Sequence, residues 1–340
     1  MSPQVIFITG ASGYIGGEVV DVMSKKHPEW TLITLVRDAE QAKLVKGKYP
    51  AVETVIGTLD DHNLLVEEGK RADVVLQIAS ADHIEAGRSI IEGMSKGKKG
   101  HYIHVSGSGI LHEVPNGYGN PSTKIYSDVD DVMEITSFDS THVHRDIDAS
   151  VIEAGIKFGI PTAIVSPVTI YGVGHGPIKT RSLQIPFLTQ GILSRGKAFT
   201  IGEGCNIWDN IYITDLAEAF RILTEEALKP HGGKATWGRE GYYFTATTDH
   251  KWVDVVKAIA KIAHERGAIP SEEIDKLTPE EASAIHPWAP LLWGGNCRSK
   301  GDRIHALGWK PIGPTVYESL PEMVDVEIKT LGKSVVATTF

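Results

Sequence analysis

Three glycines near the start of the chain have the spacing of a phosphate-binding turn. They are Gly10, Gly13 and Gly16 in the stretch FITGASGYIG, which begins in a short apolar run. A tight turn between a strand and a helix needs glycine where a side chain would clash or φ is positive. The N–H groups at the start of the following helix would then bind phosphates. We therefore predict a dinucleotide site whose contacts in this turn are Gly10, Ser12, Gly13, Tyr14, Ile15 and Gly16.

The end of the second predicted strand bears on which dinucleotide binds. This strand ends in LVRD, so Arg37 comes first and Asp38 follows. An acidic residue at this place would hold the ribose hydroxyls of the adenosine. A guanidinium can instead form a bidentate pair with a 2′-phosphate. Arg37 therefore favours NADP, and Asp38 keeps NAD open as the alternative.

Two histidines and two serines in the middle of the chain could take part in proton chemistry. His142 and His144 carry imidazoles, which titrate in the range that is useful near neutral pH. Ser106 and Ser108, in HVSGSGIL, can each hydrogen-bond a carbonyl oxygen. The plainer alternative is that the histidines only cap or decorate a helix and that the serines only form a turn.

A series of alternating strands and helices must position these residues. Strands are predicted at 5–9, 31–36, 51–56, 73–78, 101–106 and 161–166, and helices begin near 14, 38, 61, 82 and 141. The strands are near-continuous hydrophobic runs such as DVVLQIA, which is typical of a parallel sheet covered on both faces. The alternation predicts an α/β fold with a doubly wound parallel Rossmann sheet.

The second half of the chain is less regular. We predict a helix after an N-cap at Thr214, a helix over 249–266, and a capping box from Thr278 to Glu281. These patterns indicate a dinucleotide-binding domain over 1–180 and a smaller C-terminal α/β substrate lobe over 181–340, with exchange of strands or helices between the lobes. The cleft between them is expected at the strand ends.

Composition excludes several classes of partner. The formal net charge is −9, from 34 basic and 43 acidic residues without a basic block, which argues against nucleic acid. No apolar run reaches 18 residues and strand-like sequence begins by Val5, so neither a membrane span nor a signal peptide is expected. Cys205 and Cys297 are too few for a disulfide framework. We expect a cytoplasmic, soluble protein that binds no metal.

The glycine turn and five later segments resemble the extended and atypical branches of the short-chain dehydrogenase/reductase superfamily. Besides TGASGYIGG, the matching segments are GTLDD at 57–61, QIAS at 77–80, SPVTIYG at 166–172, IGEGCNIWDNIYITDLAEAF at 201–220 and LGWKP at 307–311. They span nearly the whole chain in the family's order. The resemblance implies further cofactor contacts at Leu59, Asp60, Ile78, Ala79, Ser80, Pro167 and Val168. The resemblance also implies a homodimer.

The chain departs from the family in its proton relay. The superfamily uses a tyrosine four residues before a lysine, and none of the ten tyrosines here has lysine at that spacing. The positions of the family's tyrosine and lysine correspond approximately to Thr141 and Arg145 in this sequence. The resemblance implies that Arg145 holds the nicotinamide ribose, although arginine cannot tune a partner by losing its own proton. The proton would then come from His142 or His144, or from water that they relay.

The remaining catalytic candidates would act on the developing oxyanion. Chain order places Ser106 or Ser108, the start of the 141–145 helix and Tyr171 near the ends of the fifth and sixth strands. A developing oxyanion needs donors that are already in place. Each of these groups is therefore expected to face the substrate.

A second departure concerns the substrate. In NIWDN, Trp208 stands where sugar-nucleotide members carry an arginine for the pyrophosphate, and tryptophan cannot neutralise a diphosphate. Arg181 and Lys179 could replace it. A nucleotide-sugar epimerase is therefore less favoured than an enzyme for a smaller aromatic or terpenoid-like metabolite.

Three functions agree with these observations. The first is an NADP(H)-dependent oxidoreductase that reduces a carbonyl or related group of a small, largely apolar metabolite without the usual tyrosine–lysine pair. The second is a non-catalytic dinucleotide sensor like the NmrA-type regulators. The third is an NAD-dependent epimerase or dehydratase.

Overall fold

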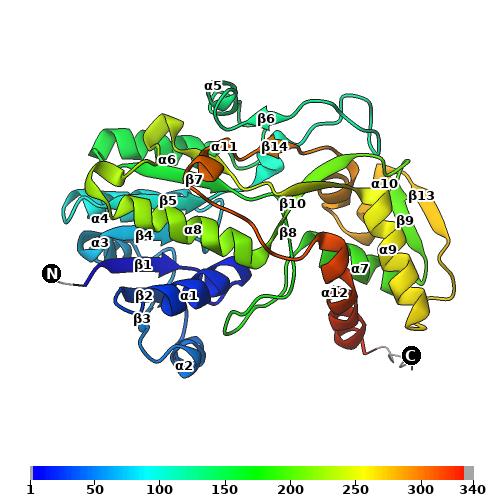
Figure 1. The fold of residues 1–340 in the computed structure, drawn as a ribbon, viewed down its shortest axis with the longest axis horizontal. Helices are drawn as coiled ribbons and strands as arrows, with labels where there is room; N and C mark the ends of the chain where they lie inside the picture. Colours follow the sequence, from blue (N-terminus) through cyan, green and yellow to red (C-terminus); the bar gives the residue numbers. More distant parts are fainter. Residues whose placement is uncertain (1–2, 333–340) are drawn as a thin grey trace.

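A seven-stranded sheet forms the centre of the larger lobe. The computed structural model describes residues 3–332. The strand order is β11-β7-β5-β4-β1-β2-β3, and each pairing is parallel, which confirms the predicted doubly wound sheet (Figure 1). The strands are β1 (Val5–Thr9), β2 (Thr31–Val36), β3 (Glu53–Ile56), β4 (Val74–Gln77), β5 (His101–Val105), β7 (Thr162–Ser166) and β11 (Tyr242–Phe244).

Helices cover both faces of this sheet because its strands are apolar on both sides. Phe7 packs into the cluster that includes α3 (His62–Arg71), α4 (Ile84–Ser95) and α6 (Arg145–Phe158). Ile6 and Ile8 pack into the other cluster, with α1 (Tyr14–Lys26), α2 (Ala39–Lys48) and α8 (Ile213–Ala227). The near-continuous hydrophobic runs are thus explained by burial on two faces.

The smaller lobe consists of short sheets and helices (Figure 1). Its strands are β8 (Thr169–Tyr171), β10 (Ile207–Tyr212) and β12 (Thr248–Lys251) in one sheet, and β9 (Ala198–Ile201) with β13 (Ile274–Leu277) in another. Its helices include α7 (Gln184–Arg195), α9 (Trp252–Glu265), α10 (Pro279–Ile285) and α12 (Val316–Thr330). The strands β6 (Tyr126–Ser127) and β14 (Ser299–Lys300) pair with each other. Short helical segments are η1 (Ser108–Leu111), α5 (Val132–Ile135), η2 (Pro230–Gly232), η3 (Gly238–Glu240), η4 (Pro290–Gly294) and α11 (Asp302–Ala306).

Two segments beyond residue 180 return to the larger lobe. β11 pairs with β7 at the edge of the central sheet, and α8 packs on α1. The boundary at residue 180 itself stays a prediction.

The helix termini agree only in part with the sequence-based predictions. The capping box is present: the Glu281 N–H donates to the Thr278 hydroxyl at 3.2 Å, and the Thr278 N–H donates to the Glu281 carboxylate at 2.8 Å. The prediction of Thr214 as an N-cap is wrong, because α8 begins at Ile213. The Thr214 hydroxyl instead donates to the Glu18 carboxylate at 2.7 Å.

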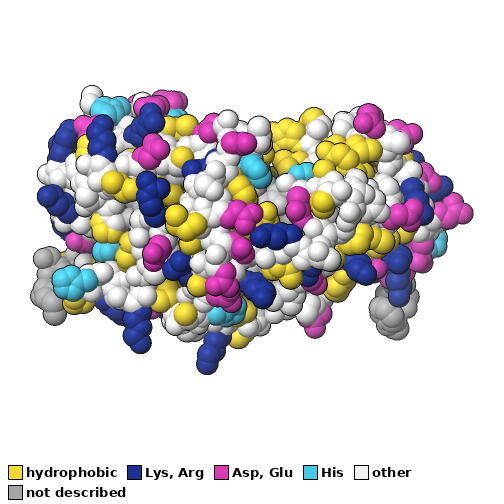
Figure 2. All heavy atoms as spheres, turned by 90° about the horizontal axis from the view of Figure 1, so that it is seen from above, with side chains coloured by type: hydrophobic (Ala, Val, Ile, Leu, Met, Phe, Trp, Pro, Cys, Tyr) yellow, Lys and Arg dark blue, Asp and Glu magenta, His cyan; other side chains and the backbone are white. Residues whose placement is uncertain are grey.

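The surface carries charges of both signs. On the face shown in Figure 2, basic and acidic side chains are interspersed, and apolar side chains gather toward the end formed by the smaller lobe. Within residues 3–332, no helix is long and apolar enough to cross a membrane.

Candidate functional site

The glycine turn after β1 is shaped by close contacts with its own backbone and with the segment after β4. Gly10 has φ +85°, and a Cβ there would lie 2.7 Å from the Ala79 nitrogen, so only glycine fits. A Cβ on Gly16 would collide with the Gly10 carbonyl. The close contact at Gly16 is therefore with the turn itself. Gly10 and Gly16 together bring the start of α1 close to the carboxyl end of β1.

The N-terminus of α1 is available to an anion. Gly13 is its N-cap, and within residues 3–332 no side chain caps the helix and no acidic residue lies in its first turn. α2 and α10, by contrast, are capped by Asp38 and Thr278. Uncapped N–H groups and the helix dipole favour a phosphate at this position. The turn therefore fits the pyrophosphate of a dinucleotide.

The other predicted residues of the turn differ in their freedom to contact a ligand. Ser12 and Ile15 are half-buried. The Tyr14 hydroxyl donates to the Gly172 carbonyl at 2.7 Å, and burial raises its pKa well above the ordinary value. Tyr14 thus ties α1 to the segment after β8, and its expected cofactor contact would involve the ring or backbone.

Arg37 and Asp38 have different roles at the end of β2. The Asp38 carboxylate accepts the Gln41 N–H at 2.8 Å and caps α2. Arg37 is exposed, and its guanidinium has no hydrogen-bond or ion-pair partner among residues 3–332. The guanidinium is therefore free to meet an anion, whereas the carboxylate is already used.

The segment after β4 is fixed to the end of β1. The N–H groups of Ile78 and Ala79 donate to the Thr9 hydroxyl at 3.1 and 3.2 Å, and this hydroxyl donates to Gln77. The predicted contacts Ile78, Ala79 and Ser80 therefore lie beside the glycine turn. Ala79 is exposed at this edge, and Ser80 is half-buried.

The predicted contacts after β3 join the same edge. The Asp60 carboxylate lies 3.0 Å from His83 Nε2, so it is linked to the start of α4. Leu59 is half-buried against the core. Both residues follow β3, at the carboxyl edge of the sheet that also carries Ser80.

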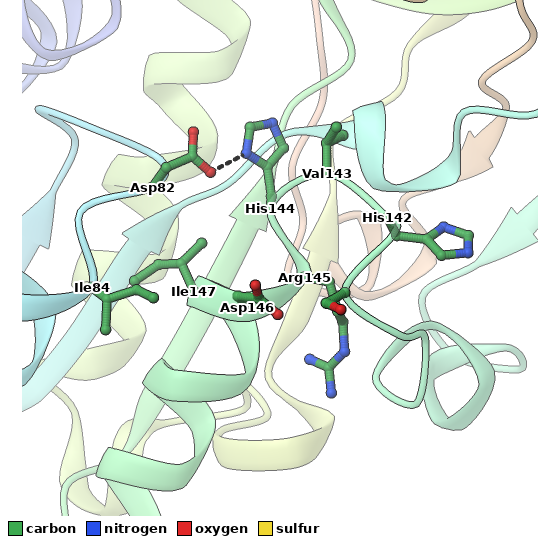
Figure 3. A pocket seen from close by; sticks show the side chains of 9 residues that line it. Asp82, Ile84, His142, Val143, His144, Arg145, Asp146 and Ile147 are labelled. Carbon is green, nitrogen blue, oxygen red and sulfur yellow. Dashed lines mark hydrogen bonds and ion pairs between the residues drawn. The ribbon is translucent and has the colours of Figure 1, made fainter.

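A pocket of about 260 Å³ opens between the turn after β4 and the start of α6 (Figure 3). Its lining residues are Asp82, Ile84, Ser140, His142, Val143, His144, Arg145, Asp146 and Ile147. Three of the predicted catalytic residues therefore share one pocket. They come from a single turn, which ends where α6 begins at Arg145, four residues later than expected.

Asp82 and His144 form a close pair in this pocket. His144 Nδ1 lies 2.6 Å from Asp82 Oδ1 (Figure 3). The hydrogen bond from His144 holds the pKa of Asp82 below its usual range. His144 has φ +66° and ends the turn as the N-cap of α6. Asp82 was not among the predicted residues, because 62 positions separate it from His144 in the chain.

His142 points away from this pair (Figure 3). Its Nδ1 lies 2.8 Å from the Ile110 carbonyl, and its ring stacks on Phe138 with 4.1 Å between the centroids. These contacts fix the ring against the segment after β5. The two histidine candidates thus have different partners.

Arg145 is partly used inside the chain. Its Nε donates to the Phe138 carbonyl at 2.8 Å and its Nη2 to the Thr136 carbonyl at 2.5 Å. Nη1 is buried without a partner within the described chain. Nη1 is thus left for a ribose hydroxyl, and the expected ribose contact stays a prediction.

Ser106 belongs to a buried network rather than to the pocket lining. Its hydroxyl donates to the Asp148 carboxylate at 3.2 Å, and Tyr242 donates to the same oxygen at 2.9 Å. Burial raises the pKa of Asp148 to about 6. The Ser106 hydroxyl is thus committed to Asp148.

Ser108 links the turns after β5 and β7. Its N–H donates to the Pro167 carbonyl at 2.9 Å, and its own carbonyl accepts from Cys297. The Ser108 hydroxyl is buried and has no partner among residues 3–332. Val168 is buried in the core next to Pro167. Ser108, Pro167 and Val168 therefore lie together at the carboxyl edge of the sheet.

Tyr171 does not line the pocket. Its side chain is only 3% exposed, and its hydroxyl donates to the Pro314 carbonyl at 2.8 Å. Burial raises its pKa above the ordinary value. This engaged hydroxyl does not support the expected role as an oxyanion donor.

The side chains expected near a substrate phosphate are engaged or buried. Trp208 is buried, and its indole N–H donates to the Gly295 carbonyl at 2.9 Å. Arg181 makes a two-point ion pair with the buried Glu327, at 2.5 and 2.8 Å. Lys179 is exposed. Of the two basic candidates, only Lys179 is left for a substrate.

The loop between β8 and α7 lies on α1 (Figure 1). The buried Glu18 carboxylate accepts the His175 N–H at 2.5 Å and lies 3.0 Å from His175 Nδ1. A Cβ on Gly17 would be 2.8 Å from the Gly176 Cα, and one on Gly176 would be 3.1 Å from the Gly17 Cα. The ligand atoms of Glu18, Asp21 and His175 lie within 4.8 Å of one another. The hydrogen bonds of these three residues hold the loop between β8 and α7 on α1, and this contact explains why the three side chains lie together.

Comparisons with known proteins agree with this geometry. The NmrA-like family matches residues 2–137. Oxidase ucsJ from Acremonium sp is 32% identical over 344 residues, which cover 97% of this chain and 99% of that protein.

Solved structures show the same fold. The dTDP-glucose 4,6-dehydratase from Bacillus anthracis, in complex with NAD, has a TM-score of 0.68 at 16% identity, covering 96% of this chain and 97% of that one. The UDP-glucose 4-epimerase from Thermotoga maritima, with UDP-glucose, has a TM-score of 0.65 at 15% identity, covering 96% and 100%. The full-length similarity to the oxidase, the NmrA-like match and the shared fold together confirm the resemblance seen in the sequence. The chain belongs to the extended short-chain dehydrogenase/reductase family, in its epimerase/NmrA-like branch.

Proposed function

We propose that this protein is an NADP(H)-dependent oxidoreductase that reduces a carbonyl or related group of a small, largely apolar metabolite. The observation that carries the proposal is the pair at the end of β2. Asp38 is used as a helix cap, while the neighbouring Arg37 guanidinium is exposed and free. A free guanidinium at this place favours a dinucleotide with a 2′-phosphate.

The rest of the site fits the same cofactor. The uncapped start of α1 would hold the pyrophosphate, and the edge formed by Ile78, Ala79 and Ser80 would lie beside it. The solved relative with NAD supports a nicotinamide dinucleotide in this position. When bound, the reduced nicotinamide would supply a hydride to the substrate.

The name of the oxidase relative supports redox chemistry in this chain. The tyrosine–lysine pair of the superfamily is absent, so another group must handle the proton. The pocket is lined by titratable side chains that are candidates for that task, among them His144 with its partner Asp82. General acid catalysis typically contributes about 10²–10⁴-fold to a rate.

An apolar substrate is favoured over a nucleotide sugar. Arg181 is tied to Glu327, and the buried Trp208 offers no charge for a diphosphate. Large apolar side chains, among them Leu183 and Trp288, are exposed in the smaller lobe. We therefore place this protein apart from the sugar-nucleotide epimerases and dehydratases whose fold it shares.

The test is the cofactor preference of the Arg37→Ala variant. A charge-assisted contact contributes about 1.5–3 kcal/mol, or about 10- to 150-fold in affinity. The parent should bind NADPH more tightly than NADH, and the variant should lose most of that difference while NADH affinity stays nearly constant. Calorimetric Kd values measure this effect, with Arg239→Ala as the control for loss of one exposed arginine far along the chain. Equal affinities of the parent for NADPH and NADH would contradict the proposal.

A non-catalytic dinucleotide sensor is the second candidate. Two observations favour it: no tyrosine has lysine at the family spacing, and the NmrA-like family matches residues 2–137. A panel of aromatic and aliphatic carbonyls separates the two functions. Oxidation of NADPH with any of them supports the reductase, whereas binding without oxidation favours the sensor.

A further inference from the structure

We propose that His144 donates the proton to the substrate oxygen, that Asp82 positions its ring, and that Gly107 is a glycine because this ring occupies the side-chain space. The proposal rests on the oxidoreductase function and assigns the group that replaces the missing tyrosine. It starts from the His144–Asp82 pair, whose atoms lie 2.6 Å apart at the edge of the pocket (Figure 3).

The carboxylate of Asp82 selects one nitrogen of His144. A carboxylate accepts hydrogen bonds, so the neutral ring carries its proton on Nδ1 and exposes Nε2. This nitrogen lies against the turn after β5: a Cβ on Gly107 would be 2.9 Å from Nε2. Nε2 is therefore directed toward the carboxyl edge of the sheet, where the substrate is expected.

The glycine at 107 is not required by its backbone. Its φ is −163° and its ψ is 141°, an extended conformation that any residue adopts. The nearest atoms to a Cβ at this position are Nε2, Cδ2 and Cε1 of His144, at 2.9, 3.2 and 3.9 Å. The three nearest atoms thus all belong to the His144 ring, and an added methyl group would have to displace it. The imidazole of His144 lies in the space that a side chain at position 107 would occupy.

The other candidates are less well placed. His142 is held between the Ile110 carbonyl and the Phe138 ring. The hydroxyls of Ser106 and Tyr171 donate to Asp148 and Pro314. His144 keeps a free ring nitrogen and a side chain that is 24% exposed, so it can regain a proton from solvent.

The proton step balances with the hydride step. As the carbonyl carbon takes the hydride, the carbonyl oxygen takes the proton from Nε2 of the His144 imidazolium. The products are the alcohol, the oxidised dinucleotide and a neutral imidazole, which water reprotonates. Asp82 touches no reacting atom and acts only through the orientation and charge of His144.

Several charged or titratable groups lie near His144 in the chain or in space. Asp82 contacts its ring directly, and Arg145, Asp146 and Asp148 follow it on α6. His104 lies nearby on β5, and burial lowers its pKa to about 4, so it stays neutral at physiological pH. Asp82 is thus the negative charge in hydrogen-bond contact with the imidazolium, and its loss should weaken the protonated form.

The sign of the pH dependence follows from the donor's charge. His144 must be protonated to donate, so carbonyl reduction should fall as pH rises through its titration. In Asp82→Asn the hydrogen-bond acceptor remains but the charge is gone. The alkaline limb of the pH–rate profile should therefore move to lower pH in this variant.

The kinetic experiment compares four variants with the parent, with NADPH and the best carbonyl of the panel. His144→Gln should lower kcat by about 10²–10⁴-fold and remove the alkaline limb, with NADPH affinity unchanged. Gly107→Ala should approach the same loss, because the added methyl group displaces the ring. Asp82→Asn should shift the limb, whereas the control Asp146→Asn, which removes the same charge from the same pocket without contact to the ring, should not.

A second readout does not depend on activity. Nitrogen-15 NMR of histidine-labelled protein reports the tautomer and titration of each ring, with His144→Gln giving the assignment. The parent should show a neutral His144 protonated on Nδ1, a lower titration midpoint in Asp82→Asn, and a change in the His144 signals when NADP⁺ is added. An unchanged titration in Asp82→Asn, or no response to NADP⁺, would overturn the assignment.

The results of these experiments distinguish a failure of the proposed role of His144 from a failure of the proposed oxidoreductase function. If the parent reduces a carbonyl, and His144→Gln has the same kcat and the same alkaline limb in its pH–rate profile, only the proposed role of His144 fails. If the parent oxidises NADPH with no carbonyl in the panel, the oxidoreductase function fails and the catalytic role of His144 fails with it.

Discussion

Replacing Asp148 with asparagine should make the protein's stability less dependent on pH. The Asp148 carboxyl is buried on α6, where one oxygen accepts from both Ser106 and Tyr242 and the other has no partner among the described residues. Burial raises its pKa to about 6 from the ordinary value of 3.8. An asparagine in the same rotamer keeps the oxygen that accepts from Ser106 and Tyr242. Like the protonated acid, it carries no charge.

The magnitude follows from the difference between the two pKa values. Between pH 3.8 and about 6 the folded chain binds more protons at this site than the unfolded chain, so the free energy of unfolding falls as pH rises. A shift of about two units corresponds to about 3 kcal/mol. This cost is absent below pH 3.8, is fully present above pH 6, and should vanish in Asp148→Asn. The variant's stability relative to the parent should therefore rise by about 3 kcal/mol from pH 4 to pH 8.

Urea unfolding of both proteins from pH 4 to pH 8 measures this change. Asp128 and Asp209 are also buried acids with raised pKa values, but their contributions cancel in the difference between variant and parent. At pH 4 the variant should be the less stable protein, because its amide N–H groups have no acceptor, at a cost of about 1–3 kcal/mol. A difference between the two proteins that stays constant across this pH range would refute the argument.

Two further predictions concern the glycine turn and the smaller lobe. Gly13→Val should abolish binding of NADPH while the free protein stays folded. Its φ of −85° suits any residue, and the nearest contact of a Cβ, 3.1 Å to the Gly10 carbonyl oxygen, needs only a small shift. The added side chain would occupy the approach of the pyrophosphate, and a thermal shift with NADPH that persists would show that the turn is only structural. Arg181→Met should lower the free energy of unfolding by about 2–4 kcal/mol, since it leaves the buried Glu327 unpaired beside a partly exposed site. Glu327→Gln added to Arg181→Met should restore most of this loss in urea unfolding, and failure to do so would show that the pair does not act through charge.

The central sheet could be predicted because its signals are local. The near-continuous apolar runs predicted both ends of β1 and of β2 correctly. The observed β4 is shorter than its predicted range by one residue at each end. Helix termini were predicted less well where a side chain has a distant partner. Thr214 has the right type for an N-cap, but its hydroxyl is drawn to the Glu18 carboxylate on α1.

The candidate site depends more on contacts between distant segments. The sequence shows that His144 is titratable and near the start of a helix, but not that the turn after β4 brings Asp82 to its Nδ1. The engagement of Arg181 by Glu327 likewise joins residues that are 146 positions apart. Residue types and local order identify the candidates, and only the packed structure shows which of them are already occupied.

The contact between Gly17 and Gly176 limits how this family member can diverge. A Cβ on Gly17 would lie only 2.8 Å from the Gly176 Cα, so alanine at position 17 requires the loop to move. A Cβ on Gly176 would lie 3.1 Å from the Gly17 Cα and would push the two segments apart by a smaller amount. Substitutions at the two positions should therefore be inherited together, or be accompanied by a change in the length of the loop. A homologue with a larger residue at either position would have to carry the loop elsewhere. The identities of these two residues thus serve as a marker of loop position that can be read in sequences without a structure.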